Sequence, residues 1–126
     1  KRGPLDSWVP FRPSLDLLRM LAERRFVELL REQNHLITTS NMVFRKSLHA
    51  RLQGFRPYRY VHDWDFALRA MLLGRPAYIR RFLTAYRVHR RNTILEDARM
   101  GDIETRSMLD RFQEEASCFT ETKGVV

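Results

Sequence analysis

Five apolar residues in the middle of the chain recur at the spacing of one buried face of an α-helix. They are Trp64, Ala67, Leu68, Met71 and Leu72. Side chains at i, i+3, i+4, i+7 and i+8 lie on a single stripe of a helix, and an apolar stripe has to be covered by other parts of the chain. Gly74 and Pro76 follow, and this combination ends a helix. The sequence therefore predicts a helix over about 64–73 whose large apolar side chains are buried in the core.

Two longer helices are predicted on either side of this one. The first begins at Ser14, a good N-cap residue after Pro13, and runs to about residue 33. The second begins at about residue 93, where Thr93 and Glu96 have the spacing of a capping box, and runs to about residue 117. The dipeptide Gly101-Asp102 could divide this last helix in two.

Three short strands complete the expected fold. Residues 36–44 are apolar at both ends and small and polar in the middle, which predicts a strand whose centre passes a polar site. Residues 77–82 and 84–88 are the other two strands, and residues 45–52 form a short helix. We therefore expect an α/β fold in which three main helices surround a small mixed sheet, with all 126 residues in one domain.

The charge of the chain favours an anionic partner. Lysine and arginine number 23 against 15 aspartate and glutamate, a net charge of +8, and the pI is about 10.5. Such a surface attracts phosphate groups, so nucleic acid, an anionic membrane face and a nucleotide diphosphate all fit. Only Lys1, Lys46 and Lys123 are lysines, and this excess of arginine favours bidentate contacts with phosphate or carboxylate.

Cysteine content and hydropathy point to a reducing compartment. Cys118 is the single cysteine, so it can form neither an internal disulfide nor a zinc cluster. No apolar run approaches the roughly 18 residues that a membrane span needs, and residues 1–6 lack the apolar stretch of a signal peptide. We expect a cytoplasmic protein, which could also lie peripherally at the inner face of the membrane.

The sequence His62-Asp63-Trp64-Asp65 carries the strongest signal for chemistry. It places two carboxylates and an imidazole where a loop meets the buried helix. Asp63 has two interpretations: an N-cap that accepts hydrogen bonds from backbone N–H groups, or a general base held on a rigid helix start. Asp65 stands four residues before Arg69, a spacing that indicates an ion pair within the helix rather than a catalytic group.

A second group of polar residues lies at 86–92. In a strand, Tyr86 and Val88 would point to one face and Arg87 and His89 to the other, so that a cation and an imidazole share a polar surface. An isolated histidine is usually an ordinary, partly exposed side chain, and nothing at metal-ligand spacing stands nearby. The segment alone therefore does not establish a binding site.

Five segments of the chain, in order, resemble the second half of family 2 glycosyltransferases, which have the GT-A (Rossmann-like) fold. They are Asn34 to Lys46, Gln53 to Phe55, His62 to Arg69, Gly74 to Ile79 and Tyr86 to Thr93. The similarity covers about residues 26–94. Each segment alone is a weak signal, whereas five segments in the right order and spacing are specific.

The resemblance implies an inverting transfer of a sugar from a nucleotide-sugar donor to a hydroxyl of a glycan or other acceptor. Asp63 matches the aspartate that deprotonates the acceptor hydroxyl in this family. His62 replaces the glutamate that precedes that aspartate, so the usual acceptor contact of the glutamate is altered here. The resemblance thus favours Asp63 as a catalytic base that also supports the start of the helix.

The same resemblance assigns residues to the two substrates. Those on the acceptor side are Ser40, Asn41, His62 and Trp64. Arg87 and His89 match residues that approach the donor diphosphate, and His89 would also contact the divalent metal, Mg²⁺ or Mn²⁺, of the intact enzyme.

An Asp-x-Asp motif holds the metal and the sugar nucleotide in the donor-binding half of such enzymes. None precedes the matched region here, and the single Asp-x-Asp of the chain is Asp63-Trp64-Asp65 itself. We therefore expect this chain to be the C-terminal, acceptor-side portion of a glycosyltransferase domain, inactive and without metal on its own. Absence of the other half would expose a sheet edge or an apolar patch, so a homodimer is also expected.

Two other classes of function stay open. One is a small basic helical module that binds nucleic acid, supported by the net charge and by the pairs Arg80-Arg81 and Arg90-Arg91. Against it, the arginines are spread over helices and turns. The other is an adaptor that buries Trp64 and Tyr86 against a protein partner. Salt-sensitive oligonucleotide binding would favour the first, and sugar transfer that is insensitive to Asp63→Asn would favour the second.

Overall fold

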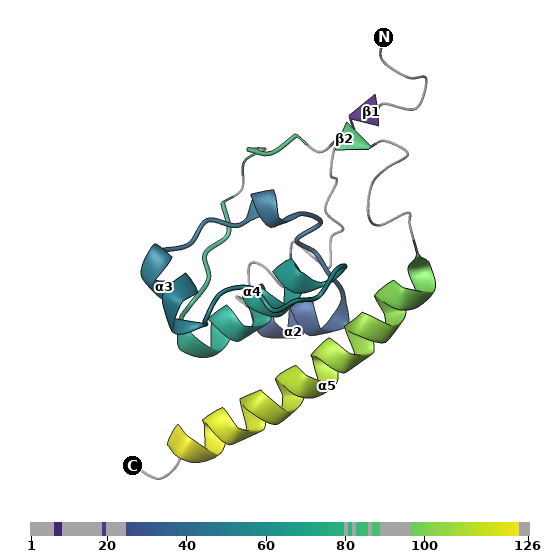
Figure 1. The fold of residues 1–126 in the computed structure, drawn as a ribbon. Coiled ribbons are helices and arrows are strands. Elements are labelled where there is room, and N and C mark those ends of the chain that lie inside the picture. Colours follow the sequence, from purple (N-terminus) through teal and green to yellow (C-terminus); the bar gives the residue numbers. More distant parts are fainter. Residues whose placement is uncertain are drawn as a thin grey trace.

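The computed structural model describes residues 7–8, 19, 25–79, 81, 83–85, 87–88 and 97–123. Their secondary-structure elements, in chain order, are β1 (Ser7–Trp8), α2 (Phe26–Glu32), the 3-10 turn η1 (Thr39–Asn41), α3 (Lys46–Arg51), α4 (His62–Leu73), β2 (Arg87–Val88) and α5 (Ala98–Lys123). Figure 1 shows α4 in the middle of the molecule and α5 running diagonally along one side of it. None of the helices in these ranges combines the length and the apolarity that a bilayer crossing requires.

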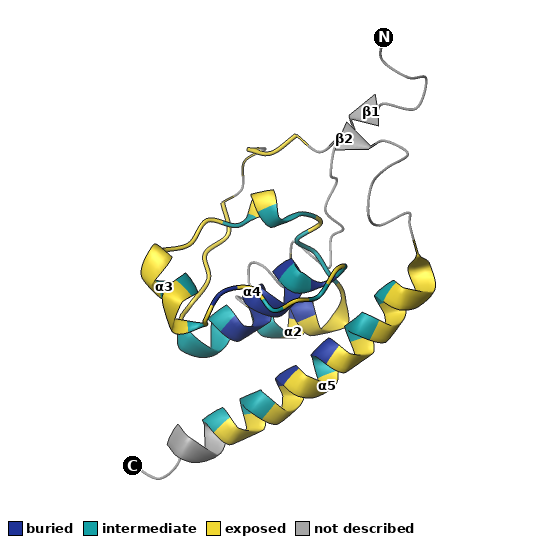
Figure 2. Ribbon diagram, in the orientation of Figure 1, coloured by how far each residue is buried: buried dark blue, intermediate teal, exposed yellow. Residues whose placement is uncertain are grey.

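The core forms where α4 packs against α2 and α5. The buried residues that contact one another there are Leu30, Val61, Trp64, Ala67, Leu68, Met108 and Phe112. Figure 2 shows this burial as dark blue along α4, with further buried positions on α5. The apolar face predicted for 64–73 therefore does form the centre of the core. Met71 and Leu72 pack against its edge and are only partly buried.

Helix α4 starts two residues earlier than its apolar pattern indicates, at His62, and ends at Leu73. Asp63 and Asp65 lie in its first turn, where negative charge is favourable beside the unpaired N–H groups of a helix start. At the other end, the N–H of Gly74 donates to the carbonyl oxygen of Ala70 at 3.1 Å. The end predicted at Gly74 is confirmed.

The predicted α/β fold with a small mixed sheet is wrong for the described residues, which are helical. No strand forms at 36–44 or at 77–79. The extended pairing that is present joins β1 to β2 in antiparallel fashion, with two residues on each side: Ser7 opposite Val88 and Trp8 opposite Arg87. This pairing does not make the layered sheet of a GT-A domain.

Local hydrogen bonds explain why 36–44 is not a strand. The side-chain amide of Asn41 donates to the carbonyl oxygen of Leu36 at 2.6 Å, and the Asn34 side chain accepts from the Leu36 N–H at 3.0 Å. The N–H of Thr38 also turns back to Leu36, at 2.7 Å. Short polar side chains that bond to the nearby backbone compete with a β-ladder in this way, and the segment becomes a turn.

Two further elements agree in part with the sequence. Helix α3 lies within the predicted 45–52, and the chain leaves it through left-handed backbone at Gln53 (φ 57°) and Gly54 (φ 78°). Helix α2 lies within the predicted 14–33, of which residues 14–18 and 20–24 lie outside the described residues.

Helix α5 is continuous, so the expected division at Gly101-Asp102 is wrong. An interior glycine costs only about 1 kcal/mol relative to alanine, which burial of Met108 and Phe112 outweighs. The Asp97 side chain accepts from the N–H of Met100 at 3.0 Å and so caps the helix. The capping box predicted at 93–96 lies outside the described residues.

Candidate functional site

Three polar side chains from two separate parts of the chain meet at the start of α4. The Thr39 hydroxyl, on η1, lies 3.3 Å from Nε2 of His62 and donates to Oδ2 of Asp63 at 3.4 Å. These contacts join residues 23 and 24 positions apart in the sequence. The polar segment predicted to pass a site and the acidic segment are therefore adjacent in space.

Asp63 divides its two carboxylate oxygens between the helix and this cluster. The residue is 6% exposed, and Oδ1 accepts from the backbone N–H of Trp64 at 2.8 Å. Val61 is the N-cap of α4, so Asp63 lies in the first turn and is not the N-cap itself. It nevertheless pairs one N–H of the helix start, while Oδ2 faces the Thr39 hydroxyl.

Both carboxylate oxygens of Asp65 take part in an ion-pair network. The i, i+4 pair with Arg69 is present, as predicted: Oδ2 accepts from Nε of Arg69 at 2.8 Å. Oδ1 accepts from Arg56 at 2.9 Å, and Arg56 also pairs with Glu115 on α5. Because both oxygens of Asp65 bind guanidinium groups, Asp63 is the better placed of the two carboxylates to accept a proton.

Nothing in the sequence pattern singles out Arg56, which lies in a loop without a periodic spacing to Asp65. Arg56 and Arg69 together hold neighbouring parts of the chain to the first turn of α4. Arg69 donates to the carbonyl oxygens of Leu52 at 2.8 Å and of Gly54 at 2.9 Å. The turn after α3 is thereby attached to the same helix that carries Asp63.

Trp64 occupies the core. It is 6% exposed, and its indole N–H donates to the carbonyl oxygen of Leu30 on α2 at 2.6 Å. Among the residues assigned to the acceptor side, Ser40 and Asn41 are exposed on η1 beside Thr39. The hydroxyl of Thr84 donates to the carbonyl oxygen of Ser40 at 3.4 Å, which brings the segment at 83–85 to the same turn.

The residues assigned to the donor are less fully described. Arg87 lies in β2, and His89 lies outside the described residues. Within the described ranges, no three or more His, Cys, Asp or Glu side chains are grouped so that they could hold a metal ion. The metal contact implied for His89 stays a prediction.

The backbone just before η1 is strained. Ile37 has a φ of 66°, a left-handed conformation in which a β-branched side chain is crowded. The bonds of Asn34 and Asn41 to Leu36 hold the chain on both sides of this residue. Strain of this kind persists only where the surroundings enforce it, and it concentrates at binding and catalytic sites.

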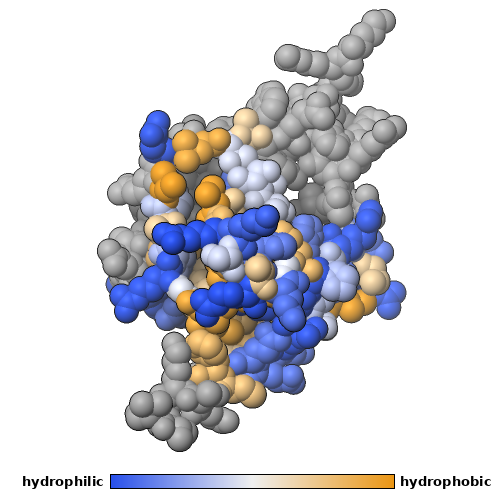
Figure 3. All heavy atoms as spheres, turned by 60° about the vertical axis from the view of Figure 1, so that its left-hand side comes forward, coloured by the Kyte–Doolittle hydropathy of each residue, from blue (hydrophilic) through white to orange (hydrophobic). Residues whose placement is uncertain are grey.

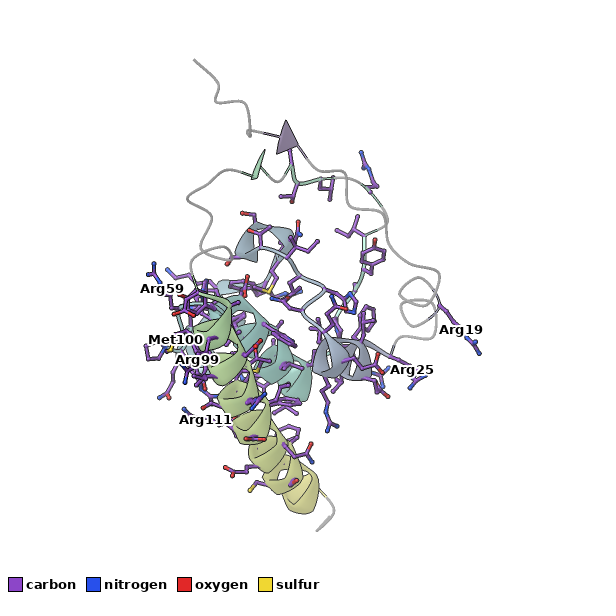
Figure 4. All side chains as sticks on the ribbon, turned by 90° about the vertical axis from the view of Figure 1, so that its right-hand side faces the viewer. Arg19, Arg25, Arg59, Arg99, Met100 and Arg111 are labelled. Carbon is purple, nitrogen blue, oxygen red and sulfur yellow. The ribbon has the colours of Figure 1, made fainter. Side chains whose placement is uncertain are left out.

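The five arginines that Figure 4 labels do not line a single face of the molecule. In Figure 4, Arg59, Arg99 and Arg111 lie beside α5, whereas Arg19 and Arg25 lie on the opposite side of the molecule. A nucleic-acid-binding surface normally gathers its basic side chains on one face or along one helix. These five side chains therefore give the nucleic-acid hypothesis no support.

Comparisons of the chain with models of protein families, with curated proteins and with solved structures give no match. A function is therefore inferred from the sequence segments and from the cluster of Thr39, His62 and Asp63.

Proposed function

We propose that this chain supplies the acceptor side and the general base of an inverting glycosyltransferase, with Asp63 as the base. A sugar hydroxyl is a poor nucleophile at neutral pH, so its proton has to leave as the new C–O bond forms. A positioned base typically contributes about 10²- to 10⁴-fold to such a step. In the proposal, Asp63 takes the proton of the acceptor hydroxyl while the acceptor oxygen displaces the nucleoside diphosphate from the donor sugar.

The contact between Thr39 and Asp63 is the observation that carries this proposal. At 3.4 Å it is long for an O–H···O hydrogen bond, whose usual length is about 2.7–2.8 Å. A weakly held hydroxyl already faces Oδ2, and the proposal places the acceptor hydroxyl at this oxygen in place of the Thr39 hydroxyl. Oδ1 meanwhile stays bonded to the Trp64 N–H, which keeps the carboxylate oriented.

The neighbouring side chains suit the binding of a hydroxylated acceptor. His62 has a ring nitrogen beside the Thr39 hydroxyl, and Ser40 and Asn41 present further hydrogen-bonding groups on the exposed turn. Trp64 contributes indirectly, by holding α4 to α2. In this proposal, His62, Ser40 and Asn41 orient the acceptor so that one of its hydroxyls reaches Asp63.

In this proposal, the donor binds at the segment that follows residue 83. The Thr84–Ser40 contact brings this segment to η1, and Arg87 follows three residues later. Arg87 and His89 would bind the donor diphosphate in the intact enzyme. The described residues by themselves do not fit a divalent metal site, so no step of the transfer is assigned to a metal here.

The experiment is Asp63→Asn in the full-length protein. Initial rates of nucleoside diphosphate release are measured over a panel of nucleotide sugars and acceptors, and NMR determines whether the anomeric configuration inverts. Asparagine keeps the size of the side chain and can still accept from the Trp64 N–H. We expect kcat to fall about 10²-fold or more, with the free energy of unfolding nearly unchanged.

Asp110→Asn is the matched control, because Asp110 is an exposed aspartate on α5. It should transfer sugar at the unsubstituted rate. The assignment of the base is wrong if Asp63→Asn transfers at close to the normal rate while Asp65→Asn does not. If no nucleotide sugar is consumed by the unsubstituted full-length protein, the proposed function itself fails.

A further inference from the structure

Four aromatic rings form a continuous cluster beside the candidate site. Phe66 on α4 is its buried base, at 1% exposure. The rings of Phe44 and Phe55 lie against it, with centroids 4.7 Å and 4.6 Å from the Phe66 ring. His49 completes one side, 5.6 Å from Phe55. Both outer phenylalanines are therefore supported from below by a residue that cannot move freely.

Phe44 and Phe55 are each 36% exposed although they are large and apolar. Val43, which precedes Phe44 in the chain, is 96% exposed. Figure 3, which brings the side carrying α3 forward, shows hydrophobic side chains at the surface next to hydrophilic ones. Contiguous exposed apolar side chains beside polar groups often mark a binding site.

The aromatic cluster continues directly into the candidate site. The rings of Phe55 and His62 meet edge to face at 5.9 Å. On its other side, His62 reaches the Thr39 hydroxyl, which in turn reaches Asp63. An exposed, rigid aromatic surface and a row of hydroxyl-binding groups are thus adjacent, with His62 common to both.

We propose that Phe44 and Phe55 form an aromatic platform that binds the apolar C–H face of a pyranose ring in the acceptor. The inference rests on the proposed function and names the class of its acceptor, a pyranoside. Such a ring offers an apolar face for the platform and hydroxyls at its edge for His62, Thr39 and Asp63. Small-molecule sites commonly combine aromatic walls with a few placed polar groups.

A pyranose fits this surface better than a purely apolar partner does. A second protein chain or a lipid tail seated on Phe55 would also cover the partly exposed side chains of His62 and Thr39. Buried polar groups that lose water without gaining a partner are costly. A sugar replaces that water with its own hydroxyls while its C–H face covers the phenylalanine rings.

The test measures binding and catalysis separately, on the full-length protein. Methyl β-D-glucopyranoside, methyl β-D-galactopyranoside and methyl α-D-mannopyranoside serve as probes in saturation-transfer NMR, and the acceptor KM is measured where transfer is detected. Phe55→Leu keeps an apolar side chain and removes the ring, whereas Phe55→Tyr keeps a ring. Val43→Ala is the control for a neighbouring exposed apolar residue that lies outside the ring cluster.

We expect Phe55→Leu to weaken binding of the best probe, and to raise the acceptor KM, by roughly 2- to 12-fold, the range for loss of one aromatic contact. Phe55→Tyr should restore binding, and Val43→Ala should leave it unchanged. Saturation transfer should be strongest at the protons of one face of the sugar.

Different outcomes overturn different claims. Unchanged probe affinity in both Phe55→Leu and Phe44→Leu refutes the platform, whatever Asp63→Asn does to kcat. If these variants instead abolish a concentration-dependent dimer in light scattering and leave probe binding intact, the surface is an interface between copies of the chain. If Phe55→Leu weakens binding but Asp63→Asn transfers sugar normally, the platform stands and the assigned base fails.

Discussion

Asp65 and Arg69 form an ion pair that is almost wholly enclosed by protein. Their side chains are 1% and 6% exposed, and the guanidinium also donates to the carbonyl oxygens of Leu52 and Gly54. A buried charge is tolerated when its partner and its hydrogen bonds are all supplied. The pair therefore fixes α4 to the turn after α3, and removal of either member takes an opposite charge from the buried side chain that remains.

Arg69→Met should destabilise the protein by about 3–5 kcal/mol, the usual cost of breaking a buried ion pair from one side. Arg56 still contacts Asp65 in this variant, which favours the lower part of that range. Urea unfolding followed by circular dichroism measures the change. Glu28→Gln is the control, because the Arg25–Glu28 pair is about half exposed and should contribute about 0–1 kcal/mol. Equal effects of the two substitutions would contradict the role given to Arg69.

Three glycine-to-alanine substitutions should change the stability of the protein in different directions. Gly54→Ala should cost about 1–2 kcal/mol, because φ is 78° and the new Cβ would come within 3.2 Å of the His49 ring. Gly101→Ala should stabilise α5 by about 0.5–1 kcal/mol, since the Cβ meets open space in a helix interior. Gly74→Ala, also in open space, should change stability by less than about 1 kcal/mol. Thermal unfolding of the three variants orders them, and a stable Gly54→Ala variant would contradict the left-handed turn.

Two substitutions at Ile37 separate backbone strain from loss of apolar surface. Ile37→Asn and Ile37→Thr both replace the side chain with a polar one, but asparagine tolerates a φ of 66° and the β-branched threonine does not. The asparagine variant should be more stable than the threonine variant by about 1 kcal/mol. Chemical denaturation of both proteins tests this order, and the reverse order would mean that the turn before η1 is not left-handed.

The sequence predicts secondary structure and contacts best where residues recur at helical spacing and their side chains are buried. The apolar spacing from Trp64 to Leu72 locates α4, Gly74 marks its end, and the spacing of Asp65 and Arg69 predicts their ion pair. The resemblance assigns Ser40, Asn41 and His62 to one side of a site, and in the structure Thr39, which precedes Ser40, contacts His62 and Asp63. Each of these inferences uses a relation between residues that a helix or a motif fixes.

The strand expected at 36–44 fails because intrinsic preference is a weak guide when side chains can bond to the backbone. Ile37, Thr38 and Thr39 all favour strands, yet the Asn34 and Asn41 side chains bond to Leu36 and turn the chain. Thr39 itself, the residue that joins His62 to Asp63, is unremarkable among neighbouring threonine and serine. Its role depends on a contact across 24 residues, which no local pattern specifies.

Stability should fall at mildly acidic pH through His35. Burial lowers the pKa of His35 below its ordinary value of 6.5, and the nearby charge of Glu32 partly opposes this shift. Between the lowered pKa and 6.5, the unfolded chain binds more protons than the folded chain, so the free energy of unfolding decreases as the pH falls through 6.5. His35→Gln should therefore lose less stability than the unsubstituted protein between about pH 7.5 and about pH 5. Parallel pH dependences in the two proteins would contradict the lowered pKa.

Helix α5 is attached to the rest of the molecule through its middle. The Glu104 carboxylate accepts from the backbone N–H groups of Arg59 and Tyr60 at 3.0 Å and 2.7 Å, Met108 and Phe112 are buried, and Glu115 pairs with Arg56. Local opening of a helix breaks only the contacts of the part that opens, so a part with more contacts opens less often. Amide hydrogens between about residues 104 and 115 should therefore exchange with solvent deuterium most slowly, with rates rising towards both ends. Opening of this middle section would release Arg56 from Glu115. The exchange rate of the amide hydrogens in this section therefore also reports how often the ion-pair network around Asp65 loses its link to α5.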